Sequence, residues 1–250
     1  MPSFKNAGVD IAYLDEGGGE PIVLVHGFAS SKDVNWVYPT WVSFLRQNGR
    51  RVIALDNRGH GESTKLYDPE EYHIGTMAGD VRALMDHLGL ARADIMGYSL
   101  GGRITAYLAR HYPDRLHRAI FGGIGLGLIE GGGPDENVAK ALEAPSLESV
   151  THKMGRTFRA FADQTRSDWR ALAACLRGSR RLMTRDEVAG ISVPVLIAVG
   201  TTDDIAGSAS ALSEIIKGSQ VLDIPRRDHM RAVGDKVYKD GVLAFLGSTA

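Results

Sequence analysis

The sequence predicts an α/β fold in which a mostly parallel sheet is flanked by helices. Short runs rich in Val, Ile and Leu recur along the chain, as expected for strands that are buried on both faces. Between them lie stretches whose apolar residues recur every three or four positions, which indicates helices with one buried face. Because strand and helix alternate, and 250 residues are enough for one large core, no second domain is required.

Six segments carry the strand signal of the central sheet: 21–27, 51–56, 93–98, 118–123, 193–200 and 221–224. Helical spacing occurs at Met77, Val81, Leu84 and Leu88, then at Leu100, Ile104 and Leu108, and finally at Val237, Val242 and Phe245. The opening segment 7–21 differs, because its short alternating runs and Gly-rich turn are typical of antiparallel strands. We therefore expect a mixed sheet at that edge.

The strand signal disappears between residues 125 and 190, and helical segments replace it after the "GGGPD" break at 131–135. This pattern is typical of a helical lid inserted into a larger fold. We predict a core formed by residues 1–124 and 191–250, with the lid at 125–190.

A candidate nucleophile lies where a strand meets a helix. The segment "MGYSLGG" places Ser99 between Gly97 and Gly101, which matches the G-x-S-x-G pattern in its required context. Small neighbours let the chain bend tightly and leave the hydroxyl exposed, and the following helix directs amide hydrogens at developing negative charge. A serine that only caps a helix is the alternative interpretation.

Backbone donors for an oxyanion are predicted at two positions. "HGF" follows the first buried strand, so the N–H of Phe28 is expected to face the same oxygen as the N–H of Leu100. His26 itself is expected to be structural. An acid and a histidine should follow at later strand ends, and the chain offers Asp203 or Asp204 and then His229.

These segments together resemble the α/β-hydrolase superfamily over nearly the whole chain. The matching motifs are "HGFASS", "DNRGHGES", "GYSLGGRITAYLARHYPDRL", "PVLIAVGTTDD" and "DHM", in the family's order. The resemblance implies an α/β-hydrolase fold with an inserted helical lid, Ser99 as nucleophile, His229 as general base and Asp203 rather than Asp204 as the orienting acid. It also implies that the "DNRGHGES" turn is structural, with Asp56, Arg58, His60 and Ser63 bonded to nearby loops.

The predicted chemistry is acyl transfer through a tetrahedral oxyanion, so a small carboxylic ester is the expected substrate. Lactones and carbon–carbon bonds are alternatives, because relatives cleave them with the same triad. A second class of function is also open, in which the protein is a receptor that binds a small ligand with little turnover. Peptidase and pseudoenzyme interpretations are weaker: prolyl aminopeptidases often have Trp where this chain has Leu100, and the Ser, His and acid set is intact.

Composition excludes several function classes. The 29 basic and 30 acidic side chains leave a formal charge of −1, which gives no attraction to nucleic acid or to an anionic membrane.

The single cysteine, Cys175, lies in an apolar helical stretch and is expected to pack in the core. No run of eighteen apolar residues or signal-peptide pattern occurs, so we expect a soluble, cytoplasmic protein. No metal or organic cofactor is expected, and no oligomeric state is predicted.

Two departures from the family concern the histidine. Asp228 stands where the family usually has Gly, and the acid loop carries two aspartates in tandem. An extra carboxylate near an imidazole favours its charged form, so a higher pH is needed to obtain the free base. We therefore hypothesise an alkaline-leaning optimum.

The lid offers apolar and basic residues with open roles. Phe158, Phe161, Trp169 and Leu182 either line a substrate pocket or anchor the lid. Lid cations either form a solvated face or steer anionic substrates; they are Lys153, Arg156, Arg159, Arg166, Arg170, Arg177, Arg180, Arg181 and Arg185. Trp36 and Trp41 either wall the acyl pocket or pack beneath the oxyanion loop.

Overall fold

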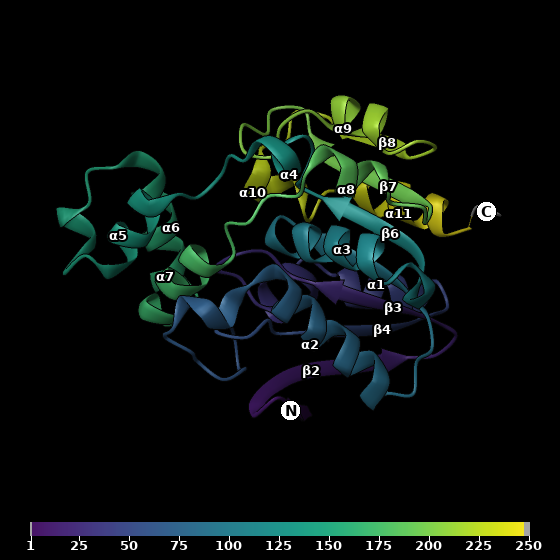
Figure 1. Ribbon diagram of the computed structural model, residues 1–250, viewed down its shortest axis with the longest axis horizontal. Helices are drawn as coiled ribbons and strands as arrows, with labels where there is room; N and C mark the ends of the chain where they lie inside the picture. The colour runs from purple at the N-terminus through teal and green to yellow at the C-terminus, as the bar shows by residue number, and fades with distance from the viewer. Residues whose placement is uncertain (1, 248–250) are drawn as a thin grey trace.

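The computed structural model describes residues 2–247, which form one eight-stranded sheet with helices on both faces (Figure 1). The strands lie in the order β1-β2-β4-β3-β5-β6-β7-β8. Their bounds are β1 (Ser3–Asn6), β2 (Val9–Gly17), β3 (Glu20–Val25), β4 (Arg50–Leu55), β5 (Ala93–Tyr98), β6 (Leu116–Gly122), β7 (Val195–Gly200) and β8 (Gln220–Ile224). The six predicted core strands correspond to β3 to β8, so the mostly parallel sheet is confirmed.

The first two strands run antiparallel to their neighbours, as the sequence predicts. Phe4 of β1 pairs with Ile11 of β2, and Leu14 of β2 pairs with Ala54 of β4 in an antiparallel register. All later neighbours from β4 to β8 are parallel. The carboxyl ends of the parallel strands therefore meet at one edge of the sheet, where loops from different strands can combine into a site.

Helices cover both faces of the sheet. In the described chain they are α1 (Trp41–Gln47), α2 (Ile74–His87), α3 (Leu100–His111), α4 (Gly127–Glu130), α5 (Glu136–Glu143), α6 (Lys153–Gln164), α7 (Trp169–Gly178), α8 (Arg185–Ala189), α9 (Ala209–Ile215), α10 (His229–Ala232) and α11 (Lys236–Gly247). One hydrophobic cluster joins α2, α3, α8 and α9 to the sheet, and a second joins α1 and α11 to its other face. In α11 the expected core residue Val237 is 41% exposed, and Tyr238 is buried instead.

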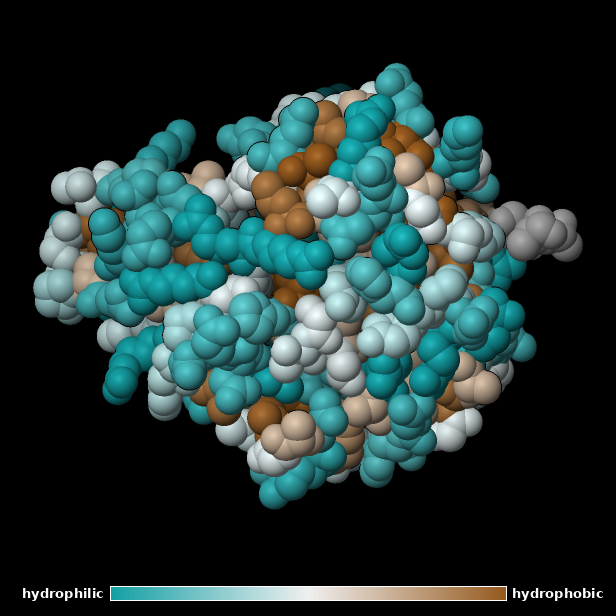
Figure 2. Space-filling model, in the orientation of Figure 1, coloured by the Kyte–Doolittle hydropathy of each residue, from teal (hydrophilic) through white to brown (hydrophobic). Residues whose placement is uncertain are grey.

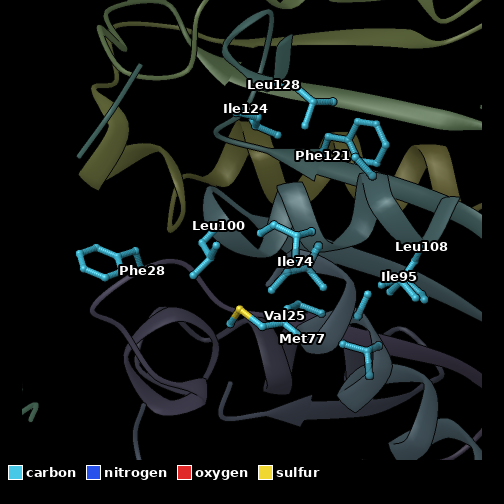
Figure 3. Close-up of a cluster of buried hydrophobic side chains, with 14 of the residues drawn as sticks. Val25, Phe28, Ile74, Met77, Ile95, Leu100, Leu108, Phe121, Ile124 and Leu128 are labelled. Atoms are coloured by element: carbon cyan, nitrogen blue, oxygen red, sulfur yellow. The ribbon is translucent and has the colours of Figure 1, made fainter. Parts of the chain in front are cut away.

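Alternate residues of the central strands enter the two clusters. In β3, Val23 and Val25 face the cluster of α2 and α3, whereas Ile22 and Leu24 face α1 and α11. This alternation explains the continuous apolar runs, since both faces of each strand are covered. Figure 3 shows part of the first cluster, in which Leu100 at the start of α3 lies among the core side chains.

The chain between β6 and β7 is helical. Helices α5, α6 and α7 pack together and project to one side of the sheet, whereas α8 contacts α3 and α9 (Figure 1). Hydrophilic side chains cover most of the face seen in Figure 2, with apolar patches between them. Within residues 2–247 no helix is long and apolar enough to cross a membrane. The lid boundaries at 125 and 190 stay a prediction.

Candidate active site

The Ser99 side chain stands at a sharp turn between a strand and a helix. β5 ends at Tyr98 and α3 begins at Leu100, so Ser99 is the single residue between them. Its φ of 54° and ψ of −110° form a conformation that residues with side chains rarely adopt. A 2.8 Å hydrogen bond from the Ser99 N–H to the Gly122 carbonyl ties the turn to β6. The surrounding structure thus maintains backbone strain, a feature that recurs at functional sites.

The glycines on either side of Ser99 are required by close backbone packing. A Cβ atom on Gly97 would lie 2.0 Å from the Gly101 carbonyl oxygen. A Cβ atom on Gly101 would lie 1.9 Å from the Val25 carbonyl oxygen. Both distances are far shorter than van der Waals contact, so a larger side chain would displace the backbone. The G-x-S-x-G spacing therefore has a direct physical cause in the packing of α3 against β3 and β5.

His229 and Asp203 meet Ser99 at the carboxyl edge of the sheet. Asp203 lies in the loop after β7, and His229 is the first residue of α10 after β8. His229 Nε2 lies 3.0 Å from Ser99 Oγ, and His229 Nδ1 lies 2.8 Å from Asp203 Oδ2. When the ring carries its proton on Nδ1, it donates to Asp203 and leaves Nε2 to accept from the Ser99 hydroxyl. The three side chains then form one hydrogen-bonded chain.

The Asp203 carboxylate is held in place by its own loop. Its Oδ1 accepts hydrogen bonds from the backbone N–H groups of Ile205 and Ala206, both 2.9 Å long. Burial works to raise the pKa of Asp203, but the hydrogen bond from His229 and these two backbone bonds outweigh it and lower that pKa below its usual range. Asp203 is therefore ionised at neutral pH. The neighbouring Asp204 is exposed and makes no hydrogen bond to His229.

Asp228 caps the short helix that begins with His229. Its side chain accepts a 2.9 Å hydrogen bond from the Arg231 N–H, and its other oxygen lies 3.8 Å from Arg231 Nε. The Asp228 side chain is 46% exposed. Aspartate is a favoured N-cap residue, which gives this departure from the family a local structural role. Its effect on the pH optimum stays a prediction.

Phe28 and Leu100 are the two predicted oxyanion donors, and both lie near Ser99. Leu100 is the first residue of α3, so its N–H has no acceptor within the helix. The loop that carries Phe28 passes close to Ser99, because a Cβ atom on Gly27 would lie 3.5 Å from Ser99 Cβ. A 2.9 Å hydrogen bond from the Gly27 N–H to Asn35 Oδ1 fixes this loop. The arrangement supports both backbone groups as candidate oxyanion donors.

Two cavities open beside Ser99, and both are also lined by Phe28. The first, which we call the apolar cavity, has a volume of about 270 Å³. Its walls include Val34, Pro39, Phe158, Phe161 and Val233. The rings of Phe28 and Phe158 lie 5.7 Å apart between their centroids, so the lid and the oxyanion loop meet here. Phe158 and Phe161 thus line a cavity, as one of the sequence interpretations holds.

The second cavity, which we call the arginine cavity, has a volume of about 300 Å³. Arg103 and Arg180 line it together with Glu130, and Leu182 lies in its wall. Trp169 lines neither cavity: the residue is 40% exposed, and the Arg159 guanidinium lies 3.7 Å from the centroid of its ring. Trp169 therefore does not line a cavity beside Ser99, because it contacts Arg159 and is exposed to solvent.

Three of the nine lid cations are paired with carboxylates of the lid. The ion pairs join Arg177 with Glu136 and Glu143, Arg159 with Asp163, and Arg181 with Glu187. Their charges are thereby offset, which weakens any long-range steering field.

Arg103, which lines the arginine cavity, was not among the residues that the sequence analysis singled out. The sequence feature that could have identified Arg103 is its position four residues after Ser99, which places it one helical turn into α3.

The "DNRGHGES" turn forms a closed hydrogen-bonded cluster, as the resemblance implies. Asp56 accepts from the N–H and Nζ of Lys32 at 2.7 and 2.9 Å, and from the Glu62 N–H at 2.9 Å. Further bonds join Arg58 to Asp80, Ser63 Oγ to the Asp56 carbonyl and His60 Nδ1 to the Arg58 carbonyl. All four named turn residues are buried. Their bonds to nearby loops are confirmed.

Other sequence candidates occupy packing positions. Trp36 and Trp41 are fully buried in the cluster of α1 and α11, where they stack edge to face with ring centroids 6.2 Å apart. Cys175 is buried in α7, and burial raises the pKa of its thiol to about 12. In the described chain, no group of three or more His, Cys, Asp or Glu side chains is placed to hold a metal ion.

Comparison with known proteins identifies the family. Residues 20–160, more than half of the chain, match the family model described as the alpha/beta hydrolase fold. A non-heme chloroperoxidase of Streptomyces lividans is 28% identical over 274 residues, covering 96% of this chain and 97% of its own. The bifunctional esterase/perhydrolase of Acinetobacter calcoaceticus is 38% identical over 109 residues, covering 43% of this chain and 38% of its own.

Solved structures agree with the family model. The enol-lactonase from Burkholderia xenovorans superimposes with a TM-score of 0.83 at 24% identity, covering 99% of this chain and all of its own. At that identity the likeness establishes the fold alone, and it matches the predicted α/β-hydrolase fold. Since the family model covers more than half of the chain, this protein is an enzyme of the α/β-hydrolase family.

Proposed function

We propose that this enzyme is a serine hydrolase that cleaves a small carboxylic ester through an acyl-enzyme intermediate. The observation that carries the proposal is the hydrogen-bonded chain from Asp203 through His229 to Ser99, with Ser99 opening onto two cavities. A serine hydroxyl is a weak nucleophile at neutral pH and needs an adjacent base. His229 Nε2 lies within hydrogen-bond reach of that hydroxyl.

In the acylation half-reaction, Ser99 Oγ attacks the ester carbonyl carbon while its proton passes to His229 Nε2. The carbonyl oxygen becomes an oxyanion, which the N–H groups of Phe28 and Leu100 stabilise. When the tetrahedral intermediate collapses, the carbon–oxygen bond to the leaving group breaks. His229 returns its proton to that alkoxide, so the alcohol leaves neutral and the acyl group remains on Ser99.

In the deacylation half-reaction, water takes the place of the alcohol. His229 accepts a proton as the water oxygen attacks the acyl carbon, and a second tetrahedral intermediate forms at the same oxyanion position. Its collapse breaks the bond to Ser99 Oγ, and His229 reprotonates the serine. The carboxylic acid is released and the enzyme is restored. Asp203 keeps the imidazole in the required tautomer and stabilises the imidazolium. The nucleophile, base and oxyanion donors all come from the chain, so the proposed mechanism requires no cofactor.

The named relatives support acyl chemistry without fixing the substrate. An esterase/perhydrolase and an enol-lactonase are among the similar proteins, so ester, lactone and peroxide-dependent acyl transfer share the same proposed intermediate. Hydrolysis is the member of this set that we propose, because water is an acceptor that needs no further binding site; a small ester is the proposed substrate, and a lactone is its cyclic counterpart.

The test compares the wild type with Ser99→Ala on a series of nitrophenyl acyl esters and simple lactones. We expect strong hydrolysis by the wild type and a loss of roughly 10⁴-fold or more in kcat/KM for the variant. An unchanged far-UV spectrum and melting temperature would show that the variant is folded. Turnover that survives in Ser99→Ala, or its absence in the wild type, would contradict the proposal and favour the carbon–carbon hydrolase or receptor interpretations.

A further inference from the structure

Arg103 lies where it can reach a substrate bound at Ser99. It is the fourth residue of α3, one turn beyond the nucleophile, and it lines the arginine cavity together with Ser99 and Leu100. Side chains on a helix lean toward its N-terminus, which directs Arg103 back toward the turn that carries Ser99. The side chain is only partly exposed.

The guanidinium group of Arg103 has few partners in the protein. Its Nη2 donates a 2.9 Å hydrogen bond to the Gly127 carbonyl at the start of α4. Among residues 2–247, no carboxylate forms an ion pair with Arg103. A guanidinium carries five N–H donors, so most of them remain available to a ligand. Burial lowers the pKa of Arg103, consistent with a charge that has lost water without gaining a counter-ion.

The two arginines that are almost fully buried in the described chain have anionic partners, whereas Arg103 has none. Arg58 is 2% exposed and forms a two-pronged pair with Asp80 at 2.7 and 2.9 Å. Arg159 is also 2% exposed, and it bonds to Asp163 and to three backbone carbonyls. A buried cation is costly unless an anion compensates it. The fold supplies that anion for Arg58 and Arg159 but leaves Arg103 facing a cavity.

The same cavity contains two more charged side chains. Arg180 follows α7 and is exposed at the cavity wall, and Glu130 at the end of α4 is exposed on the same wall. Within the described chain, neither forms an ion pair with the other or with Arg103. Two cations against one anion leave the cavity positive. The apolar cavity, which Ser99 and Phe28 also line, presents the side chains of Val34, Phe158 and Phe161.

We propose that the substrate carries a carboxylate that binds Arg103 in the arginine cavity, while its apolar part occupies the apolar cavity, which Ser99 also lines. The inference rests on the proposed ester hydrolysis and names its substrate class: a half-ester or lactone of a dicarboxylic acid, or an ester whose alcohol bears a carboxylate. A guanidinium binds a carboxylate through two parallel hydrogen bonds, which fixes the orientation of the substrate as well as its charge.

The experiment uses substrate pairs that differ only in charge. In the first set, nitrophenyl monoesters of succinate, glutarate and adipate carry a free carboxylate on the acyl side. Each is compared with the neutral diester in which that carboxylate is capped by a methyl group. The acetate ester of 4-hydroxybenzoate is compared with that of its methyl ester, which places the carboxylate on the alcohol side. We expect the charged member of one set to have a higher kcat/KM, and the preferred set identifies the side that faces Arg103.

Three variants assign the preference to Arg103. Arg103→Gln should lower the ratio of charged to neutral kcat/KM by roughly 10- to 100-fold, the range for a hydrogen bond to a charged group. Arg103→Lys should retain part of that ratio, and Arg180→Gln should lower it less, because Arg180 is exposed. Lys153→Gln is the matched control, since Lys153 is an exposed lid cation that lines neither cavity. It should leave the ratio unchanged.

A binding measurement keeps the inference testable apart from catalysis. Calorimetric titration of folded Ser99→Ala should show that monomethyl glutarate binds more tightly than dimethyl glutarate. Equal kcat/KM within every pair, or equal loss for both members in Arg103→Gln, would overturn the inference and leave ester hydrolysis by Ser99 standing. If the wild type hydrolyses no ester, the proposed function fails instead, and the titration alone decides whether the cavity selects carboxylates.

Discussion

Two clusters in this enzyme bring together a buried histidine and a buried aspartate, and they differ in what the imidazole faces. In the first, His229 Nδ1 meets Asp203 and Nε2 meets the Ser99 hydroxyl beside two cavities. In the second, His26 bonds through Nδ1 to the Gly27 carbonyl at 2.7 Å and through Nε2 to the Asn57 N–H at 2.9 Å. The comparison teaches that a base needs a ring nitrogen directed at a reactive group.

Burial determines the charge state of the second cluster. Burial lowers the pKa of His26 despite the opposing field of Asp56, and it lowers the pKa of His60 to about 3. Both rings are therefore neutral near pH 7. Asp56 is meanwhile fully engaged by Lys32 and by two backbone N–H groups. Apart from His60 Nε2, which is buried without a hydrogen-bond partner in the described chain, the buried polar side-chain atoms of the "DNRGHGES" turn bond within it or to neighbouring segments.

The sharpest test of the comparison replaces the two histidines. His229→Gln should lower kcat/KM for esters by roughly 10⁴- to 10⁶-fold, because the proton of Ser99 loses its acceptor. His26→Gln should instead cost about 1–3 kcal/mol of unfolding free energy, since the buried Asn57 N–H and Gly27 carbonyl lose their partner. The loss of kcat/KM per folded molecule should be far smaller for His26→Gln than for His229→Gln. Steady-state kinetics and urea unfolding of both variants measure the two effects, and equal kinetic losses would remove the distinction.

The two adjacent aspartates allow the next test. Asp203→Asn should lower kcat by roughly 10⁴-fold, because an amide favours the wrong imidazole tautomer. Asp204→Asn is the matched control, since Asp204 is exposed and makes no hydrogen bond to His229. It should retain nearly full activity. If Asp204→Asn were the more damaging change, the proposed acid would be misassigned.

A third test concerns the ion pair of the structural cluster. Lys32→Met leaves Asp56 buried without its ammonium partner and should lower the unfolding free energy by about 3–5 kcal/mol. Lys5→Met is the control, because Lys5 pairs with Asp10 at 3.7 Å on the surface and its side chain is 65% exposed. It should change stability by less than about 0.5 kcal/mol. A small effect of Lys32→Met on urea unfolding would mean that the backbone bonds alone satisfy Asp56.

The same ion pair predicts a pH dependence of stability. Burial works to raise the pKa of Asp56, but His26, backbone N–H groups and Lys32 together lower it, so its contribution is lost as pH falls below about 4. Burial works to lower the pKa of Lys32, but Asp56 outweighs it and raises that pKa. Its contribution is therefore present below about pH 10 and lost above the raised pKa. Between these limits the pair should contribute a constant free energy, which Lys32→Met should remove.

Sequence reasoning found the residues of the first cluster because each follows a buried strand. Parallel strands bring their carboxyl ends to one edge, so Ser99, Asp203 and His229 were expected to meet. The choice of Asp203 over Asp204 came from resemblance, since adjacent residues share the same position in a sequence pattern. Which of them turns toward the imidazole depends on the backbone bonds of Ile205 and Ala206, which no residue pattern specifies.

The lid could be predicted only as a helical segment. Its helices follow the apolar spacing, but the direction of each side chain depends on how α5, α6 and α7 pack together. Phe158 therefore lines a cavity while Trp169 faces Arg159. Arg103 was missed for the opposite reason: it lies on a core helix, where a lone arginine carries no functional pattern until the cavity beside it is known.

The smallest predicted effect concerns the charge next to His229. Asp228→Asn keeps an N-cap on α10 but removes the negative charge of the residue that precedes His229 in the chain. Under the hypothesis of an alkaline-leaning optimum, loss of that charge should move the pH profile of kcat/KM to lower pH. The displacement of the profile should be small, because Asp228 is partly exposed and lies near Arg231, and interactions between exposed charges are weak in water. A pH profile from 5 to 9 of both enzymes measures the shift. Identical profiles would remove the hypothesis of an alkaline-leaning optimum and leave Asp228 with its capping role alone.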